Sequence, residues 1–197
     1  MSVKTEVVTK DGKEFLQVTL DDTDFYLPFK LISGKKVAFL DVSGQVLLNE
    51  KSADLIVKKL KESDIQFDTI LNPVSKSNAL AHAVAVRWAK EVDPSLTHTV
   101  VARKAKAGDH HDIEATYSSV TTVTPQTIYI TEDDAEYIKG KKVLLLDDVY
   151  GGGGTTTALY ELVEKAGASI AGHVVAAVEA GGNFPEGLVY LYELPVL

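Results

Sequence analysis

VLLLDDVYGGGGT, which occupies residues 143–155, is the stretch that decides how this sequence folds. Its four leading apolar residues are typical of a strand covered on both faces, as in a parallel sheet flanked by helices. Ligands of such sheets bind beyond the carboxyl ends of the strands. We therefore expect Asp147 and Asp148 to follow the strand directly, at the edge where a ligand binds. Because adjacent carboxylates repel, this placement calls for hydroxyl groups, a cation or water beside them.

The glycine run after the carboxylates predicts an anion-binding loop. Gly151, Gly152, Gly153 and Gly154 carry no side chains, so their N–H groups can approach an anion closely. Thr155 adds a hydroxyl at the start of a predicted helix, where the dipole favours phosphate. The loop is no Walker A motif, because no Gly-Lys-Ser/Thr follows, and it fits a dinucleotide fingerprint poorly. A tight turn without a ligand is the alternative. The segment predicts a site for the hydroxyls and phosphate of a sugar phosphate.

Strands and helices alternate along most of the chain. The predicted strands fall at residues 67–71, 98–102, 143–146 and 169–178, and the predicted helices at 50–62, 78–91 and 155–166. Ser118–Thr122 and Thr127–Ile130 are predicted to be extended, and Thr131 begins a short helix as a capping residue. This order predicts an α/β fold with a mostly parallel sheet and right-handed crossovers.

The first part of the chain differs from the rest. Residues 1–47 are predicted to be β-rich, and Lys10-Asp11-Gly12-Lys13 predicts a hairpin turn between two apolar segments. We therefore divide the chain into a β-rich N-terminal extension, residues 1–47, and a core domain, residues 48–197.

Composition narrows the classes of function. The net charge is −8, from 20 basic and 28 acidic residues, which argues against general nucleic-acid binding. No apolar run is long enough to span a membrane, and no apolar signal core is present near the start. The absence of cysteine excludes disulfides and thiol catalysis. We expect a cytoplasmic protein that binds neither nucleic acid nor membranes.

Two further segments carry polar and basic side chains after predicted strands. Ser75, Lys76 and Ser77 lie between a strand and a helix, where an anion can bind. Arg103 and Lys104 follow the next strand, where they would offset the negative charge of the site. The alternatives are an ordinary surface loop with a solvated lysine and a solvated basic run.

At residues 143–155 the chain resembles the type I phosphoribosyltransferases, whose signature is a hydrophobic strand, two acidic residues and a loop ending in Gly-Gly-Thr. Arg103-Lys104, Tyr117-Ser118 and the segment 166–170 are similar to the adenine and xanthine enzymes. The resemblance covers roughly residues 67–179. It implies the Rossmann-like fold of that family, with residues 1–47 forming a hood over the base and setting specificity.

The resemblance also implies an activity: transfer of the phosphoribosyl group of phosphoribosyl pyrophosphate (PRPP) to an adenine- or xanthine-like purine, with release of pyrophosphate, in purine salvage. Asp147 and Asp148 would hold the ribose hydroxyls, and the loop from Gly151 to Thr155 would hold the 5′-phosphate. Lys76 and its neighbours would contact pyrophosphate, and Arg103-Lys104 would precede a mobile catalytic loop. Mg²⁺, bound mainly through PRPP, and a homodimer are further expectations.

The base would lie near Glu179 and Phe184, the latter either stacking on it or acting as a hydrophobic plug. Four positions depart from the family pattern. Gly152 stands where a threonine or serine is usual, Ser77 where glycine is usual, Val74 where the purine enzymes carry an acid, and Ala180 where the xanthine enzymes carry lysine.

Two other interpretations stay open. Some proteins of this fold bind PRPP or a base without catalysis and act as regulators, and the departures would suit such a role. Another sugar-phosphate transferase or hydrolase is the third possibility. His110-His111-Asp112 is not interpreted as a metal site, because the histidines lack ligand spacing and no further ligand clusters with them.

Overall fold

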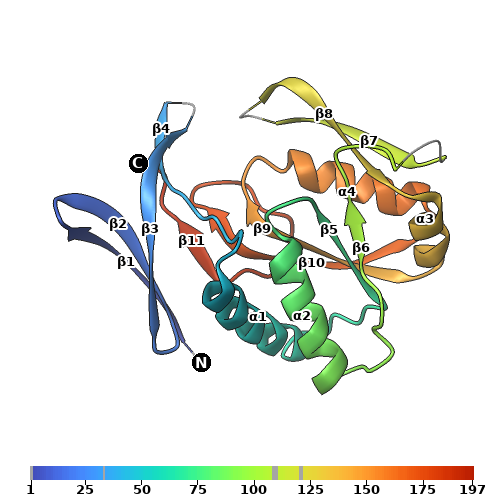
Figure 1. Cartoon of the computed structure of the whole chain (residues 1–197), viewed down its shortest axis with the longest axis horizontal. Helices are drawn as coiled ribbons and strands as arrows, with labels where there is room; N and C mark the ends of the chain where they lie inside the picture. The colour runs from blue at the N-terminus through green and yellow to red at the C-terminus, as the bar shows by residue number, and fades with distance from the viewer. Residues whose placement is uncertain (1, 33, 108–110, 120–121) are drawn as a thin grey trace.

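A five-stranded parallel sheet forms the centre of the molecule (Figure 1). The computed structural model describes residues 2–32, 34–107, 111–119 and 122–197. All neighbouring strands of the central sheet run parallel, in the order β11-β10-β9-β5-β6. Their bounds are β5 (Thr69–Pro73), β6 (Val100–Ala102), β9 (Lys142–Tyr150), β10 (Ser169–Glu179) and β11 (Tyr192–Leu194). The predicted α/β fold with a mostly parallel sheet is confirmed.

The strand order creates a crevice between β5 and β9. From β5 the chain first adds β6 on one side, and later adds β9, β10 and β11 on the other. The connections after β5 and β9 therefore leave the sheet in opposite directions, and this is where open α/β sheets bind their ligands. Residues 74–77 and 151–153 both lie at this point.

Helices cover both faces of the sheet. Their bounds are α1 (Val46–Lys61), α2 (Asn78–Glu91), α3 (Glu132–Ile138) and α4 (Gly154–Lys165). Leu144 and Leu146 of β9 pack in one hydrophobic cluster with α1 and α2, whereas Val143 and Leu145 pack in another with α3 and α4. Strand β9 is therefore buried on both sides, as its apolar run predicted.

Residues near the N-terminus form a separate antiparallel sheet, which we call the hood. Its strands are β1 (Val3–Lys10), β2 (Lys13–Leu20), β3 (Thr23–Ile32) and β4 (Lys35–Ala38), in sequential order. Asp11 and Gly12 join β1 to β2 with φ angles of 50° and 72°, so the predicted hairpin is confirmed. Leu16, Val18 and Leu20 are buried in the same cluster as α1, which anchors the hood to the core.

The last residues of the chain also tie the hood to the core. Leu197 and Lys36 exchange two backbone hydrogen bonds of 2.8 and 3.0 Å, and Val196 pairs with Val37 of β4. Since β11 immediately precedes this segment, the hood is joined to the edge of the central sheet.

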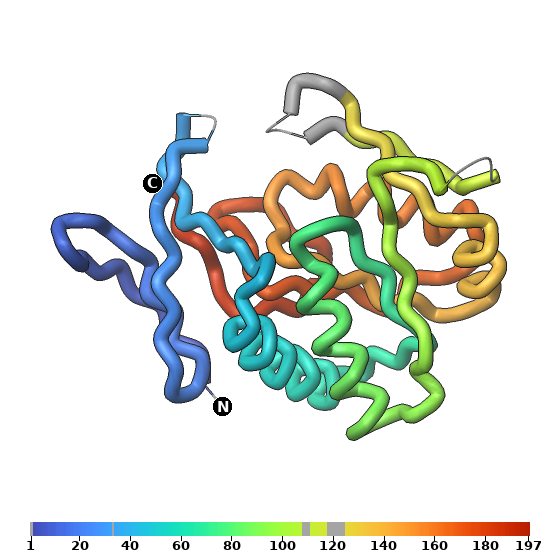
Figure 2. Tube along the Cα trace, in the orientation of Figure 1, coloured from blue at the N-terminus to red at the C-terminus, as the bar shows by residue number. Residues whose placement is uncertain are grey.

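A two-stranded ribbon lies beyond α4. It consists of β7 (Ile113–Ser119) and β8 (Thr122–Ile130), and the backbone of Arg103 bonds to that of Tyr129 at its base. Figure 2 shows the hood and this ribbon extending from different sides of the core. The ribbon begins earlier than predicted. Ala115, which is buried, and Ile113, which is partly buried, pack in the same hydrophobic cluster as α4, but the polar residues before them gave no sign of a strand. None of the described helices is both long enough and apolar enough to cross a membrane.

Candidate functional site

The two aspartates lie inside strand β9, not beyond its end, which corrects the predicted position. The pairing of β9 with β10 continues through Asp147↔Val175 to Tyr150↔Val178, so the strand runs past both carboxylates. Adjacent strand residues point to opposite faces of a sheet. The side chains of Asp147 and Asp148 therefore point to opposite faces of the sheet, and Asp147 is the one that lines a cavity there.

The Asp147 carboxyl group is electrostatically poised for a ligand. Burial raises the pKa of Asp147 well above its ordinary value, and the neighbouring Asp148 raises it further, against a smaller opposing contribution from the Ser77 hydroxyl. The backbone N–H groups of Asp148 and Val149 donate to Asp147 and Asp148 at 2.8 and 2.9 Å. Among the described residues, no lysine or arginine forms an ion pair with either carboxylate. Hydroxyl donors or a cation would supply the stabilising partner that the two carboxylates lack.

A small polar cavity opens directly beside Asp147. Its volume is about 70 Å³, and it is lined by Asp147, Val149, Tyr150, Gly151, Gly152, Gly153, Gly154, Thr155 and Thr156. Gly153 is the N-cap of α4 and has a φ of 76°, which favours glycine. The first N–H groups of α4 have no hydrogen-bond partners within the helix, and they point out of its N-terminal end, where this cavity lies. We call this space the anion cavity.

The loop after β5 is held in place by buried polar contacts. The N–H of Val74 bonds to Ala102 of β6 at 2.8 Å, and the amide of Asn72 donates to Asn78 at 2.8 Å. Ser77 is only 1% exposed, and its hydroxyl donates to the Pro73 carbonyl at 2.8 Å. Ser77 therefore supports the loop and faces Asp147, and it presents no free hydroxyl to solvent.

The basic residues predicted for the site lie around its rim. The Nζ atom of Lys76 is 4.7 Å from the centre of the Phe39 ring, so its side chain extends toward the hood. Lys76 also helps to lower the pKa of Asp41, after two larger contributions from hydrogen bonds with Ser43. Arg103 and Lys104 are exposed, one and two residues after Ala102, which is paired with Pro73. The sheet thus brings them beside residues 74–77.

A larger cavity lies between the hood and the core. It has a volume of about 380 Å³ and is lined by Ile32, Lys35, Val37, Gly151, Gly152, Glu179, Ala180, Gly181, Gly182 and Val196. We call it the hood cavity. It shares Gly151 and Gly152 with the anion cavity, so the two spaces adjoin. The Glu179 carboxylate lies so close to Gly151 that a Cβ there would come within 3.1 Å of it.

Phe184 does not line the hood cavity. Its ring packs edge-on against Tyr150, with ring centres 5.8 Å apart, and at a tilt against Tyr190 at 6.1 Å. The Phe184 ring therefore packs among aromatic side chains, and its predicted place near the base stays a prediction.

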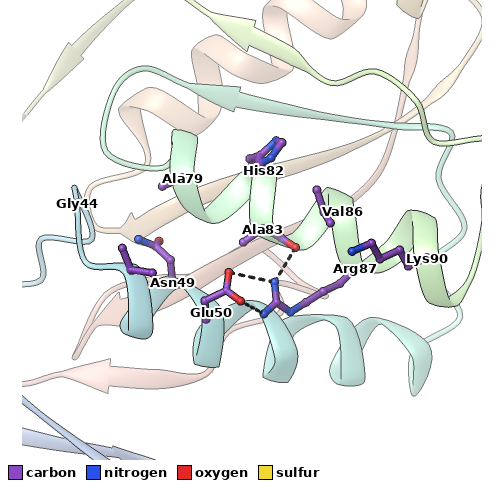
Figure 3. A pocket seen from close by; sticks show the side chains of 10 residues that line it. Gly44, Asn49, Glu50, Ala79, His82, Ala83, Val86, Arg87 and Lys90 are labelled. Carbon is purple, nitrogen blue, oxygen red and sulfur yellow. Dashed lines mark hydrogen bonds and ion pairs between the residues drawn. The ribbon is translucent and has the colours of Figure 1, made fainter.

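A cavity larger than either of these lies elsewhere, in a groove of about 560 Å³ between α1 and α2. Arg87 lines this groove, where it forms an ion pair with Glu50 and donates to the Ala83 carbonyl at 3.2 Å (Figure 3). It also forms an ion pair with Asp54 of α1. These contacts join the two helices. The groove has no glycine loop and no paired carboxylates, so size alone does not make it the functional site.

Comparison with known proteins assigns the chain to a family. A family model described as the phosphoribosyl transferase domain matches residues 45–192, which is most of the chain. This chain belongs to the phosphoribosyltransferase family. The match contains the β5 loop, the acidic pair and the anion cavity.

Curated relatives of this phosphoribosyltransferase carry the name adenine phosphoribosyltransferase. The protein of Thermosipho melanesiensis is 31% identical over 169 residues, covering 84% of this chain and 83% of the relative. That of Malacoplasma penetrans is 28% identical over 140 residues, covering 70% and 74%. These relatives place the chain beside purine enzymes.

Solved structures share the fold. The Giardia lamblia enzyme complexed with 9-deazaadenine has a TM-score of 0.61 at 20% identity and covers 98% of both chains. The adenine phosphoribosyltransferase of Rhodothermus marinus has a TM-score of 0.60 at 18% identity, covering 96% and 93%. At these identities the similarity shows the fold alone.

Within the described residues of this phosphoribosyltransferase, no three His, Asp or Glu side chains come together so that they could hold a metal ion. Of the polar segment 110–112, His110 lies outside the described residues, and Asp112 accepts from the N–H of Ala107 at 2.9 Å.

Sequence reasoning missed several residues that line these cavities, and Tyr150 and Val196 are two of them. Tyr150 lines the anion cavity, and Val196 closes the hood cavity. Tyr150 had a local signal, because it stands directly before the glycine run. Val196 had none, since its place depends on pairing with a strand that lies some 160 residues earlier in the chain.

Proposed function

We propose that this chain transfers the phosphoribosyl group of PRPP to an adenine- or xanthine-like purine and releases pyrophosphate. The observation that carries this proposal is the adjacency of two cavities. The anion cavity, with Asp147 at its edge, shares two glycines with the hood cavity, whose 380 Å³ suits a flat heterocycle. A phosphate, a sugar and a base would thus lie in a row.

The side chains around this row have complementary roles in the proposed reaction. Asp147 and Asp148 grip the ribose 2- and 3-hydroxyls, and the backbone from Gly151 to Thr155 binds the 5′-phosphate. Lys76, Arg103 and Lys104 lie at the rim, where pyrophosphate departs, and their charge stabilises it.

Positioning and electrostatics supply the catalysis. When pyrophosphate leaves, the sugar acquires the character of a ribosyl cation, as in glycoside hydrolysis. The paired carboxylates lie close to that charge and stabilise it, so no covalent nucleophile is needed. Mg²⁺ carried in with PRPP would supply charge that neutralises the leaving group, and Asp147 and Asp148 would offer it oxygen ligands.

Glu179 is the polar side chain best placed to read the base. It lines the hood cavity and lies against Gly151, beside the anion cavity. A carboxylate accepts hydrogen bonds, so it favours a base that presents an amino group or a ring N–H. The names of the curated relatives point to adenine among such bases. Purine salvage, a cytoplasmic location and a homodimer belong to the same proposal.

Turnover with individual bases tests the proposal. The protein is incubated with PRPP, Mg²⁺ and adenine, hypoxanthine, guanine, xanthine or orotate, and pyrophosphate release is measured. We expect release with adenine or xanthine and none with orotate. PRPP binding without turnover on any base would contradict the enzyme and identify a regulatory protein of the same fold.

A further inference from the structure

The anion cavity contains one side chain that its glycine loop does not explain. Tyr150 is the last residue of β9, and its ring reaches over the loop that follows. The Tyr150 hydroxyl lies so close to Gly153 that a Cβ on that glycine would be only 2.7 Å from it. The hydroxyl therefore lies at the wall of the cavity, next to the N-terminus of α4.

Few side chains can donate a hydrogen bond into this cavity. Besides the backbone, the polar side chains that line it are Asp147, Tyr150, Thr155 and Thr156. Asp147 repels an anion when ionised, and Gly152 contributes no hydroxyl. Within the described residues, the Tyr150 hydroxyl forms no hydrogen bond with another protein group. A donor that is aimed at the loop and unused by the protein is available to a ligand.

Packing holds the Tyr150 ring in this position. The ring of Phe184 meets it edge-on at 5.8 Å, and the buried ring of His173 meets it at 5.9 Å and 65°. Since neighbours fix the ring before a ligand arrives, little further ordering is needed on binding. A preorganised neutral donor beside backbone N–H groups is suited to a phosphate oxygen.

We propose that the Tyr150 hydroxyl is a phosphate-binding group, which donates to the 5′-phosphate of the substrate and makes up for the missing side chain at Gly152. This inference rests on the proposed function for the identity of the ligand. Gly152 lines the same cavity, and unlike Gly153 it is not among the glycines with a positive φ, so its backbone conformation is compatible with a side chain such as that of serine. A hydroxyl can therefore be offered to the same anion from either position.

The test compares three ligands that share parts of PRPP. Affinities of wild type and Tyr150→Phe are measured by calorimetry for ribose 5-phosphate, for PRPP with Mg²⁺ and for inorganic pyrophosphate with Mg²⁺. We expect Tyr150→Phe to weaken ribose 5-phosphate and PRPP about tenfold, as for one lost hydrogen bond to a charged group, and to leave pyrophosphate unchanged. In turnover, KM for PRPP rises and kcat changes little. Adding Gly152→Ser to Tyr150→Phe restores the affinity for ribose 5-phosphate.

Tyr160→Phe is the matched control. The Tyr160 ring also packs on His173, at 6.4 Å, but it does not line the anion cavity, so its loss leaves ribose 5-phosphate binding at the wild-type level. Equal affinity of wild type and Tyr150→Phe for ribose 5-phosphate overturns the inference, and so does an equal loss for pyrophosphate. If no base is turned over, only the proposed reaction is contradicted. The binding comparison still decides whether Tyr150 binds the phosphate. A wild-type protein that binds neither ribose 5-phosphate nor PRPP contradicts both.

Discussion

Function and stability oppose each other at Asp147. Burial and the adjacent Asp148 both raise the pKa of Asp147, so the ionised form is disfavoured in the unliganded fold. We expect Asp147→Asn to raise the free energy of unfolding at pH 7 and to reduce kcat/KM by about a hundredfold or more, because the charge that stabilises the transition state is gone. Thermal denaturation and pyrophosphate release measure the two effects.

The pH dependence of stability provides the control for the Asp147→Asn variant. Its folded pKa lies above its unfolded value near 3.8, so the folded chain holds a proton that the unfolded chain has lost. This group therefore adds stability as the pH falls toward that value. The advantage of Asp147→Asn over wild type should shrink on acidification, and an advantage that grew would contradict the assigned shift.

His173 produces the opposite pH dependence. It is only 4% exposed, neither ring nitrogen has a partner within the described residues, and burial lowers the pKa of His173 from 6.5 to about 4. Between these values the unfolded chain binds a proton and the folded chain does not, so stability is lost as the pH falls. For wild type this loss in the free energy of unfolding is about 2 kcal/mol at pH 5, and we expect His173→Leu to avoid it.

Urea denaturation of wild type and His173→Leu at pH 7, 6 and 5 measures this difference. At pH 7 the two proteins should be similar, or the variant slightly more stable, because leucine removes two unpaired polar atoms. The shift at Asp147 is present in both proteins and cancels from the comparison. A difference in stability that stays constant from pH 7 to 5 would show that His173 titrates normally.

At the scale of elements, the junction between β9 and α4 depends on Gly153. Its φ of 76° is unfavourable for a residue with a Cβ, and that Cβ would also meet the Tyr150 hydroxyl at 2.7 Å. Gly153→Ala should lower the free energy of unfolding by about 1–3 kcal/mol and weaken ribose 5-phosphate binding, because both the loop and Tyr150 must move.

Gly140→Ala separates backbone strain from this contact. Gly140 has a φ of 74°, but no atom lies within 4 Å of the position of its Cβ. We expect this variant to lose stability through strain alone and to keep full affinity for ribose 5-phosphate. If both variants lost affinity equally, the contact between position 153 and Tyr150 would have no role in binding.

Local signals determined which elements could be predicted. The helix Asn78–Glu91 and the turn at Asp11-Gly12 follow their sequence patterns, because periodicity and turn residues act over a few positions. Helix α1 begins at Val46, earlier than predicted, since the exposed Val46 and Leu47 gave no core pattern. Strand β9 extends past its apolar run because pairing with β10 continues, and that pairing is not visible in β9 itself.

The candidate site shows the same division between local and long-range information. The acidic pair and glycine loop are contiguous, so one motif predicted both. The orientation of Tyr150 depends on Phe184 and His173, which lie 34 and 23 residues further along the chain. Lys76 was singled out by its place between a strand and a helix, but its packing over Phe39 of the preceding segment had no local signal. Such contacts follow from packing, which periodicity and spacing do not specify.

On the scale of the whole molecule, the hood and the core form one packed unit. Leu16, Val18 and Leu20 of the hood share a hydrophobic cluster with Ile56 of α1 and Leu144 of β9. The division of the chain at residue 47 stays a prediction, and it separates parts that share their core. The hood cavity lies where these parts meet, so its shape depends on how firmly the hood is held.

The segment Pro195–Leu197 is the clamp that we expect to control the hood cavity. Leu197 bonds to Lys36 of β4 at 2.8 and 3.0 Å, and Val196 lines the cavity opposite Gly151 and Gly152. Removing residues 195–197 should raise KM for the purine base about tenfold or more and leave ribose 5-phosphate affinity unchanged, because the anion cavity shares none of these contacts. Val196→Ala, which keeps the backbone bonds, should produce a smaller rise. Steady-state kinetics with each base measure KM for the base, and calorimetry measures the affinity for ribose 5-phosphate. Equal losses for base and phosphate would mean that the clamp supports the whole fold and not the base cavity.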